Sequence, residues 1–269
     1  MSDSRRVELR PALAALVTLL TLASGARAAT PTAKPGAKPA AAVAAPAPAA
    51  ATPDEKLLAS IDLFARAPKS FRATLAIGAA NVKKKAEFEI WRGATGELLV
   101  RPLDPKAKGK FFLLRGPEAW FLAPGAKQPV RLGPGYRLSG GAALEEITGL
   151  RLVEGYTIAA RSQAKEIETL ELAAKSGDAA WGRIRLAYWK DRLLPLRAEL
   201  QSKSGKTLRL LEFDSWKDEK GLIPDSITIK DVARGGAPIQ VELHAFEPRD
   251  VPAALFALDD PSERAKLGG

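Results

Sequence analysis

The only histidine, His244, and four adjacent pairs of acidic residues are the side chains that come nearest to catalytic or metal-binding chemistry. The chain has no cysteine, so disulfides, thiolate metal sites and thiol catalysis are impossible. Without a second histidine a zinc site has too few preferred ligands, and no metal is expected. A Ser-His-Asp triad is assembled in space and stays a distant option, because the G-x-S-x-G motif is missing.

The acidic pairs are poorly placed for catalysis by two carboxylates. Neighbouring side chains point to opposite faces of a strand, and on a helix they diverge by about 100°. We therefore expect solvation as the role of these pairs, which are Asp54/Glu55, Glu145/Glu146, Asp218/Glu219 and Asp259/Asp260. The glycine motifs that bind phosphates and dinucleotides are also missing. The sequence accordingly predicts a protein that is not an enzyme and uses no cofactor.

Basic residues outnumber acidic ones, giving a formal net charge of +10. Residues 1–28 hold four arginines and two acids, which leaves +8 on the remainder. Such a charge favours an acidic surface such as anionic lipid headgroups. Nucleic acid is not expected, because no recognition motif is present. The runs Lys83-Lys84-Lys85 and Lys106/Lys108/Lys110 fit either solvated hairpin ends or docking on anionic headgroups or an acidic partner.

Residues 1–28 have the three parts of a secretory signal peptide. Three arginines within the first ten residues form a positive start, 12–22 is apolar, and Ala26-Arg27-Ala28 is a small-x-small cleavage site. The apolar run is shorter than the roughly 20 residues that a membrane-spanning helix needs. We expect cleavage after Ala28 and a periplasmic location. The alternative is a signal anchor that stays attached.

Residues 29–53 consist almost entirely of Ala, Pro, Thr, Gly and Lys. Such a segment cannot bury enough apolar surface to fold, and its prolines make it a semi-extended linker. The linker is either a spacer that lets the domain work away from a surface or a disordered leader with no role. We expect the folded domain to occupy 54–269.

The start of this domain carries a helix signal. Thr52 is suited to be the N-cap, Pro53 the first helical residue, and Glu55 the partner in a capping box. The apolar spacing predicts a helix of about 13 residues that ends before Pro68. One face of this helix is apolar and must cover another element, through Leu57, Leu58, Ile61 and Phe64.

From Phe71 onward the hydrophobic pattern has a period of two. About ten short strands follow, and Ser204-Gly205 and Gly235-Gly236 mark hairpin turns. The pattern predicts one large antiparallel sheet or barrel with an apolar side and a wet side, and His244 falls on the wet side. The Gly-rich stretch 133–155 interrupts the sheet, with a short helix around 142–147. Residues 251–269 form a polar tail with a brief apolar segment.

Several ordered pieces over roughly 54–260 are similar to outer-membrane lipoprotein-sorting proteins, LolA-like relatives of the periplasmic lipoprotein carrier. The pieces are Pro102, Lys108-Gly109, Trp120-Phe121 with Pro124, Pro134-Gly135-Tyr136-Arg137-Leu138-Ser139-Gly140, Leu193-Leu194-Pro195-Leu196-Arg197-Ala198-Glu199 and Gly221-Leu222-Ile223-Pro224. The family usually continues with an acidic and aromatic stretch after Ser-Gly. Here 142–147 has no aromatic residue, which allows a different ligand or partner.

The resemblance implies a mainly β (α+β) fold: a single curved antiparallel sheet, or incomplete β-barrel, with plugging helices on its concave face. It also implies a periplasmic carrier or chaperone that holds acyl chains of a lipoprotein or lipid in an apolar hollow. An inner-membrane transporter complex and an anionic membrane surface are further expected partners, and a monomer is expected. The cavity candidates are Leu57, Ile61, Phe64, Phe88, Ile90, Trp120, Leu122, Ile184, Leu186, Tyr188, Ile227, Ile229, Val241 and Leu243.

One alternative belongs to a different class of protein. The curved sheet could pack its own core completely and dock on an envelope transporter complex without any ligand. The two hypotheses differ in whether the hollow is empty or filled by the protein's own side chains. Trp120 and Tyr188 share strand faces with apolar neighbours and are the first candidates for the cavity wall.

Overall fold

The computed structural model describes residues 50–126, 128–177, 179–218 and 221–267. Contacts divide the chain into Met1–Pro48 and Ala49–Gly269, and all the described residues belong to the second unit. The predicted signal peptide 1–28, its cleavage after Ala28 and residues 29–49 of the predicted linker lie outside the described residues. These remain predictions, as does the start of the domain at residue 54.

Within the described residues, thirteen strands form one antiparallel sheet. The strands are β1 (Phe71–Ala79), β2 (Ala86–Arg92), β3 (Leu98–Pro102), β4 (Phe111–Arg115), β5 (Glu118–Leu122), β6 (Val130–Leu132), β7 (Tyr156–Ala164), β8 (Ile167–Ala174), β9 (Arg183–Trp189), β10 (Leu194–Gln201), β11 (Thr207–Asp218), β12 (Leu222–Asp231) and β13 (Ile239–Pro248). The two hairpins predicted around Ser204-Gly205 and Gly235-Gly236 are confirmed as β10–β11 and β12–β13.

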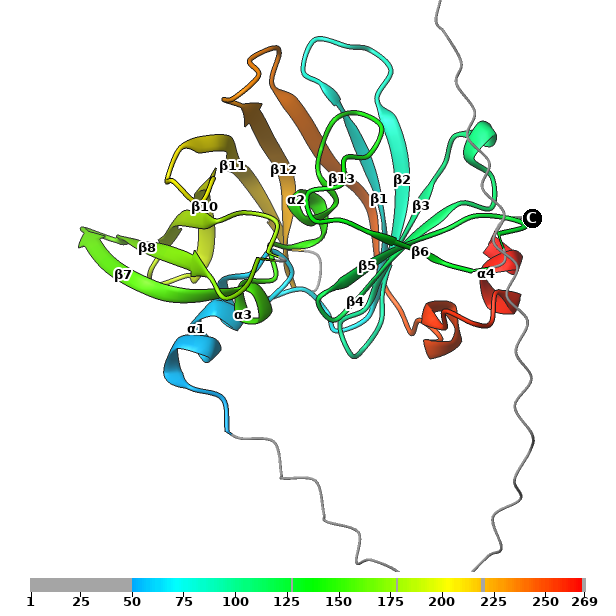
Figure 1. Cartoon of the computed structure of the whole chain (residues 1–269), viewed down its shortest axis with the longest axis horizontal. Helices are drawn as coiled ribbons and strands as arrows, with labels where there is room; N and C mark the ends of the chain where they lie inside the picture. The colour runs from blue at the N-terminus through cyan, green and yellow to red at the C-terminus, as the bar shows by residue number, and fades with distance from the viewer. Residues whose placement is uncertain (1–49, 127, 178, 219–220, 268–269) are drawn as a thin grey trace, which may run out of the picture. The chain divides into compact units, whose positions relative to one another are not determined.

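The strand order shows how the chain runs through this sheet. It is β6-β5-β4-β3-β2-β1-β13-β12-β11-β10-β9-β8-β7, so β6 and β7 are the two edges and the barrel is not closed. The chain meanders from β1 to β6, passes through residues 133–155 to the far edge, and meanders back until β13 pairs with β1 (Figure 1). The predicted curved sheet, or incomplete barrel, is confirmed.

The first helix, α1 (Pro53–Ile61), begins as predicted and ends earlier. Thr52 and Glu55 form the reciprocal capping box. The helix is nine residues long rather than about 13, because Asp62 has extended backbone. Its carboxylate accepts hydrogen bonds from the backbone N–H groups of Leu63 (2.7 Å), Leu150 (3.2 Å) and Leu152 (3.3 Å). Asp62 thus joins α1 to a segment 88 residues further along the chain.

Residues 133–155, here called the plug segment, contain α2 (Leu144–Thr148) and α3 (Leu152–Gly155). Together with α1 they cover the concave face of the sheet (Figure 1). Gly140 has a φ of 92°, and a Cβ there would lie 2.6 Å from the carbonyl oxygen of Ile77 in β1. Glycine is therefore required for the plug segment to approach the sheet this closely.

The main core lies between this concave face and the helices. Leu58, Ile61 and Phe64 from the N-terminal region and Leu144 and Ile147 from α2 pack there against inward-facing residues of most strands. Phe64 is buried although it lies beyond α1. The predicted amphipathic helix therefore does cover the apolar side of the sheet, with help from the turn that follows it.

A second apolar cluster lies apart from the main core, and it corrects the prediction of a wet outer side. Trp91, Leu99 and Leu113, which are neighbours on β2, β3 and β4, pack under Leu255 and Phe256 of the C-terminal region. This region folds into η2 (Ala253–Phe256) and α4 (Ser262–Leu267). The stretch expected to be a polar tail is thus a cover for part of the sheet.

A buried carboxylate lies beside this second cluster. Glu89 of β2 is 2% exposed and pairs with Arg72 and, at 2.6 Å, with Arg101. Arg101 in turn lies over the ring of Trp91, with 5.4 Å between the guanidinium carbon and the ring centroid. Glu89 alternates on β2 with Phe88 and Ile90 of the main core, and two arginines balance its charge.

Candidate binding cleft

The larger of two described open clefts lies between the two edges of the sheet and has a volume of about 520 Å³. One wall comes from β4, β5 and β6, and the other from α3, the start of β7 and the connection between β8 and β9. The lining residues are Leu114, Pro117, Glu118, Ala119, Arg131, Leu132, Gly133, Pro134, Glu145, Leu150, Arg151, Glu154, Gly155, Tyr156, Ser176, Ala179 and Ala180.

The strand order explains why a cleft forms at this place. The edge strands β6 and β7 do not pair with each other, and the plug segment passes between them. Proline at 134, directly after Gly133, cannot donate a backbone hydrogen bond and so favours an end to β6. β6 is only three residues long, so the two walls stay apart at this seam.

The two walls of the cleft carry apolar side chains together with five charged ones, Glu118, Arg131, Glu145, Arg151 and Glu154. Leu114, Ala119 and Leu132 are cross-strand neighbours on β4, β5 and β6. Leu150 and Tyr156 face them from the plug segment and β7. A concave apolar surface with a few polar groups is typical of small-molecule sites, and its volume falls in the usual range of about 300–1,000 Å³.

The polar groups of the cleft come mainly from the plug segment. Glu145 accepts a hydrogen bond from the backbone N–H of Gly135 at 3.1 Å, and its second carboxylate oxygen is buried without a partner. Burial raises the pKa of Glu145 and lowers that of Arg151. Arg151 donates to the carbonyl oxygen of Gly116 in the β4–β5 turn. This contact bridges the plug segment and the opposite wall.

Tyr156 at the start of β7 is a lining residue of the cleft and is itself buried. Its hydroxyl accepts a hydrogen bond from the backbone N–H of Trp181 at 3.3 Å. Burial raises the pKa of Tyr156 to about 12, so the phenol is neutral at physiological pH. The indole N–H of Trp181 is buried without a partner. Tyr156 therefore adds a neutral group to the lining of the cleft.

A second cleft, of about 420 Å³, has a different character. It lies beside the C-terminal region and is lined by Arg72, Glu89, Arg101, Arg249 and Lys266 among others. Such a lining suits water and ions better than an alkyl chain, because buried charges need charged or hydrogen-bonding partners.

The residues predicted from the sequence to line a cavity lie elsewhere. All but two of them pack in the main core, with Leu57 at its margin, and none lines the cleft. The core residues among them are Ile61, Phe64, Phe88, Ile90, Ile184, Leu186, Tyr188, Ile227, Ile229, Val241 and Leu243. The structure therefore brings these residues together, but they pack against one another.

Trp120 and Leu122 are the two exceptions. Leu122 belongs to the second cluster, and Trp120 packs against that cluster. Tyr188 belongs to the main core. Trp120 and Tyr188 thus lie in different clusters, because alternate residues of β5 face opposite sides and Ala119 and Phe121 are the ones that pack against the main core. Their role in lining a cavity stays a prediction.

The interior between sheet and helices holds little free space. Two voids that reach it, one beside Ile61 and Leu186 and one beside Phe64 and Val241, each have a volume of about 10 Å³. A void of this size holds at most a single water molecule. In the described conformation the hollow is filled by the protein's own side chains.

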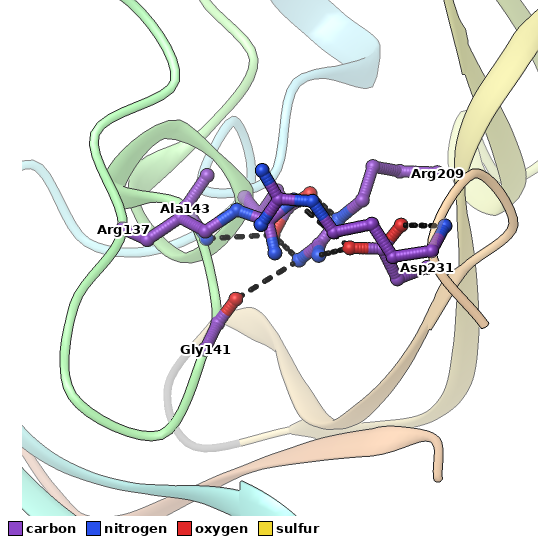
Figure 2. A network of polar contacts seen from close by, with 7 residues as sticks. Arg137, Gly141, Ala143, Arg209 and Asp231 are labelled. Atoms are coloured by element: carbon purple, nitrogen blue, oxygen red, sulfur yellow. Dashed lines mark hydrogen bonds and ion pairs between the residues drawn. The ribbon is translucent and has the colours of Figure 1, made fainter. Parts of the chain in front are cut away.

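A buried ionic network anchors the plug segment to the sheet (Figure 2). Arg209 of β11 is 1% exposed and donates to both carboxylate oxygens of Glu146, at 2.7 and 2.6 Å. It also contacts Asp231 at 3.1 Å and the carbonyl oxygen of Gly141 at 3.2 Å. Arg137 binds the same carboxylate of Asp231 at 2.9 Å. Glu146 was predicted to be solvated, and that prediction is wrong.

The strand pattern contained a signal for this network that was missed. Arg209, Leu211 and Phe213 alternate on β11, and the two apolar residues are in the main core. Arg209 therefore had to face inward, where a charge needs a buried partner. Burial alone would lower the pKa of Arg209, but its interactions with Glu146 and Asp231 outweigh burial and raise it.

His244 is exposed on β13, as predicted, with its Nε2 3.6 Å from Glu242. The described residues contain no group of three or more His, Cys, Asp or Glu side chains placed to hold a metal ion. Over the same part of the chain, no helix has the length and apolar character needed to cross a membrane.

Comparison with solved structures identifies the class of fold. A LolA superfamily protein from Nitrosomonas europaea matches with a TM-score of 0.64 and 21% identity, covering 78% of this chain and 99% of its own. An outer membrane lipoprotein-sorting protein domain from Vibrio parahaemolyticus has a TM-score of 0.55 and 13% identity, covering 70% and 88%. A DUF1329 family protein from Desulfovibrio piger has a TM-score of 0.55 and 17% identity, covering 76% and 95%. The fold is LolA-like, as the sequence resemblance implied.

A comparison with models of protein families identifies the sequence family of this chain. A family model described as "Uncharacterized protein" matches residues 96–259, more than half of the chain, and the protein belongs to that family. A comparison with curated proteins gave no match.

Proposed function

We propose that the protein is a non-enzymatic periplasmic carrier that binds an acyl chain of a lipoprotein or lipid. The observation that carries this proposal is the cleft of about 520 Å³ at the seam of the curved sheet, whose lining includes several apolar side chains. An alkyl chain in water costs about 0.8 kcal/mol per CH₂ group. A cleft walled by Leu114, Leu132 and Leu150 removes part of that cost.

The fold supports the same proposal. Structures with this curved sheet include proteins named for the LolA superfamily and for outer membrane lipoprotein sorting. A chain that leaves the cytoplasm through its predicted signal peptide would meet acylated proteins and lipids. A donor such as an inner-membrane transporter complex would deliver the cargo, and the protein would act as a monomer without a cofactor.

The proposed ligand site differs from the one inferred from the strand pattern. The main core residues, such as Ile184 and Val241, would contact an acyl chain only if the plug segment moved away from the sheet. An acyl chain could make its first contacts in the cleft without any movement of the plug segment. We therefore place the entry of the acyl chain between Leu132 and Tyr156.

Binding of a dansyl-labelled fatty acid tests the proposal. Ala180→Trp places a large ring in the cleft, and Ala94→Trp makes the same change in the exposed β2–β3 turn. We expect the cleft variant to bind about tenfold more weakly or worse, since losing two CH₂ contacts costs about 1.6 kcal/mol. Ala94→Trp should bind like the unmodified protein. Absence of binding by the unmodified protein would reject the carrier function.

A second candidate function is favoured by the filled interior. With internal voids of only about 10 Å³, the domain resembles the alternative in which a solid curved sheet docks on an envelope protein complex. Native mass spectrometry of protein purified without detergent separates the two. Co-purified lipid or lipoprotein supports the carrier, whereas a clean apo mass after incubation with acylated ligands supports the docking module.

A further inference from the structure

The turns at one end of the sheet form a continuous feature that the cleft does not include. Alternate hairpins of an antiparallel meander turn at the same end, so six turns share this end. The four central ones are neighbours along the sheet, at 103–110, 80–85, 232–238 and 202–206, and the β5–β6 and β8–β9 connections lie outside them. We call the four central turns the basic rim. The turns 80–85 and 232–238 lie side by side (Figure 1), and the backbone N–H of Ala80 donates to the carbonyl oxygen of Pro238 at 2.9 Å.

Charge in the basic rim is almost entirely of one sign. The turn 232–238 exposes Arg234 and each of the other three exposes two lysines, whereas the four turns together contain one acid, Asp104. The carboxylate of Asp104 accepts the backbone N–H of Lys106 at 2.9 Å, as a cap of the short helix η1 (Pro105–Ala107). The exposed lysines are Lys83, Lys84, Lys106, Lys108, Lys203 and Lys206.

Exposed apolar side chains gather at the same end. Val82 and Val232 lie in the rim turns and are 43% and 54% exposed. Val130 opens β6 at this end, and the ring of Tyr136 lies 5.6 Å from that of Phe112 at the start of β4. These four are the large hydrophobic residues that are exposed among the described residues. A surface that combines exposed apolar side chains with lysines is suited to binding at the membrane interface.

The opposite end of the same strands provides a contrast within the molecule. Its turns carry both signs, with Glu97 between β2 and β3, Lys165-Glu166 between β7 and β8, and Lys190-Asp191-Arg192 between β9 and β10. A general excess of lysine would charge both ends alike. The asymmetry therefore belongs to the rim.

We propose that the basic rim docks on the surface of an anionic phospholipid bilayer. The lysines would approach the headgroups, and Val82 and Val232 would enter the boundary between headgroups and acyl chains. Exposed lysines spread over four turns suit a broad anionic surface such as a bilayer. This docking goes beyond the carrier function, because it does not require an occupied cleft.

Sedimentation with vesicles tests the docking. Phosphatidylcholine vesicles with and without a phosphatidylglycerol fraction are mixed with the purified protein. We expect binding only to the anionic vesicles, and weaker binding as salt is raised. The double variant Lys83→Gln/Lys84→Gln should bind about 25-fold more weakly, from about fivefold per lysine. Val82→Ser/Val232→Ser should also weaken binding. A purely electrostatic association would not depend on these two uncharged side chains.

The matched control is Lys56→Gln/Lys69→Gln, which removes two exposed lysines at the opposite end. This variant should bind anionic vesicles like the unmodified protein. Equal binding to both vesicle types, or equal loss in the control and the rim variant, would overturn the proposal. The fatty-acid assay separates the two functions, since Lys83→Gln/Lys84→Gln should keep ligand binding and Ala180→Trp should keep vesicle binding.

Discussion

Replacing Arg209 by Met is the most direct test of how the plug segment is held. The substitution keeps much of the apolar volume and removes the guanidinium that contacts both oxygens of Glu146. Asp231 keeps its ion pair with Arg137 at 2.9 Å. Glu146 keeps only the hydrogen bond from the backbone N–H of Ala143, at 2.7 Å. The main effect is therefore an uncompensated buried charge on α2.

The size of the stability loss follows from leaving the Glu146 carboxylate buried without its charged partner. Removing one partner of a buried ion pair costs about 3–5 kcal/mol. For a domain of this size, about 2–4 °C of melting temperature is lost per kcal/mol, so we expect a fall of roughly 6–20 °C. Adding Glu146→Gln to Arg209→Met removes the stranded charge while retaining an acceptor for Ala143. The double variant should therefore be more stable than Arg209→Met alone.

Chemical and thermal unfolding of the four proteins in this cycle measure the coupling energy, which we expect to be at least about 1 kcal/mol. Arg185→Met is the matched control, because Arg185 is half exposed and lies 4.0 Å from Glu199. It should change the free energy of unfolding by less than about 1 kcal/mol. Additive single effects, or a loss from Arg209→Met no larger than the control, would refute the reasoning.

Two further predictions concern the cleft and the C-terminal cover. Burial raises the pKa of Glu145, so the folded state binds this proton more tightly and stability falls as pH rises above the usual carboxyl range. Glu145→Gln should have a higher melting temperature than the unmodified protein near neutral pH. The difference in melting temperature should shrink on acidification below about pH 4. A difference that stays constant with pH would contradict this. Phe256→Ala, at a site that is 4% exposed, should cost about 3–5 kcal/mol in denaturant unfolding, whereas a loss below about 1 kcal/mol would mean that the cover contributes little.

Much of the fold could be predicted because its signals are local. The capping box of Thr52 and Glu55 and the two glycine-marked hairpins are set by neighbouring residues, and all are present. β6 and most of β7 gave no clear alternation, since edge strands bury little; β7 is exposed over most of its length. Edge strands carry the weakest pattern in any one-sided sheet.

The candidate site was harder to predict because it depends on tertiary contacts. Strand periodicity identifies which residues face inward, as for Ile184 and Val241, but it cannot tell a filled core from a hollow. The cleft depends on where two sheet edges stop, and its walls include Gly133 and Ala180, which carry no chemical signature. The C-terminal cover was likewise not predicted, because 251–269 is a polar stretch with only a brief apolar segment.

The pairing of β1 with β13 has a consequence for the order of folding. Every other neighbouring pair of strands is a consecutive hairpin, whereas Phe71 pairs with Pro248. The two meanders can each form as they emerge, but the ladder that unites them requires nearly the whole chain. Closing so long a loop is slow relative to hairpin formation. Synthesis alone would therefore leave the domain incomplete until its last strand is available.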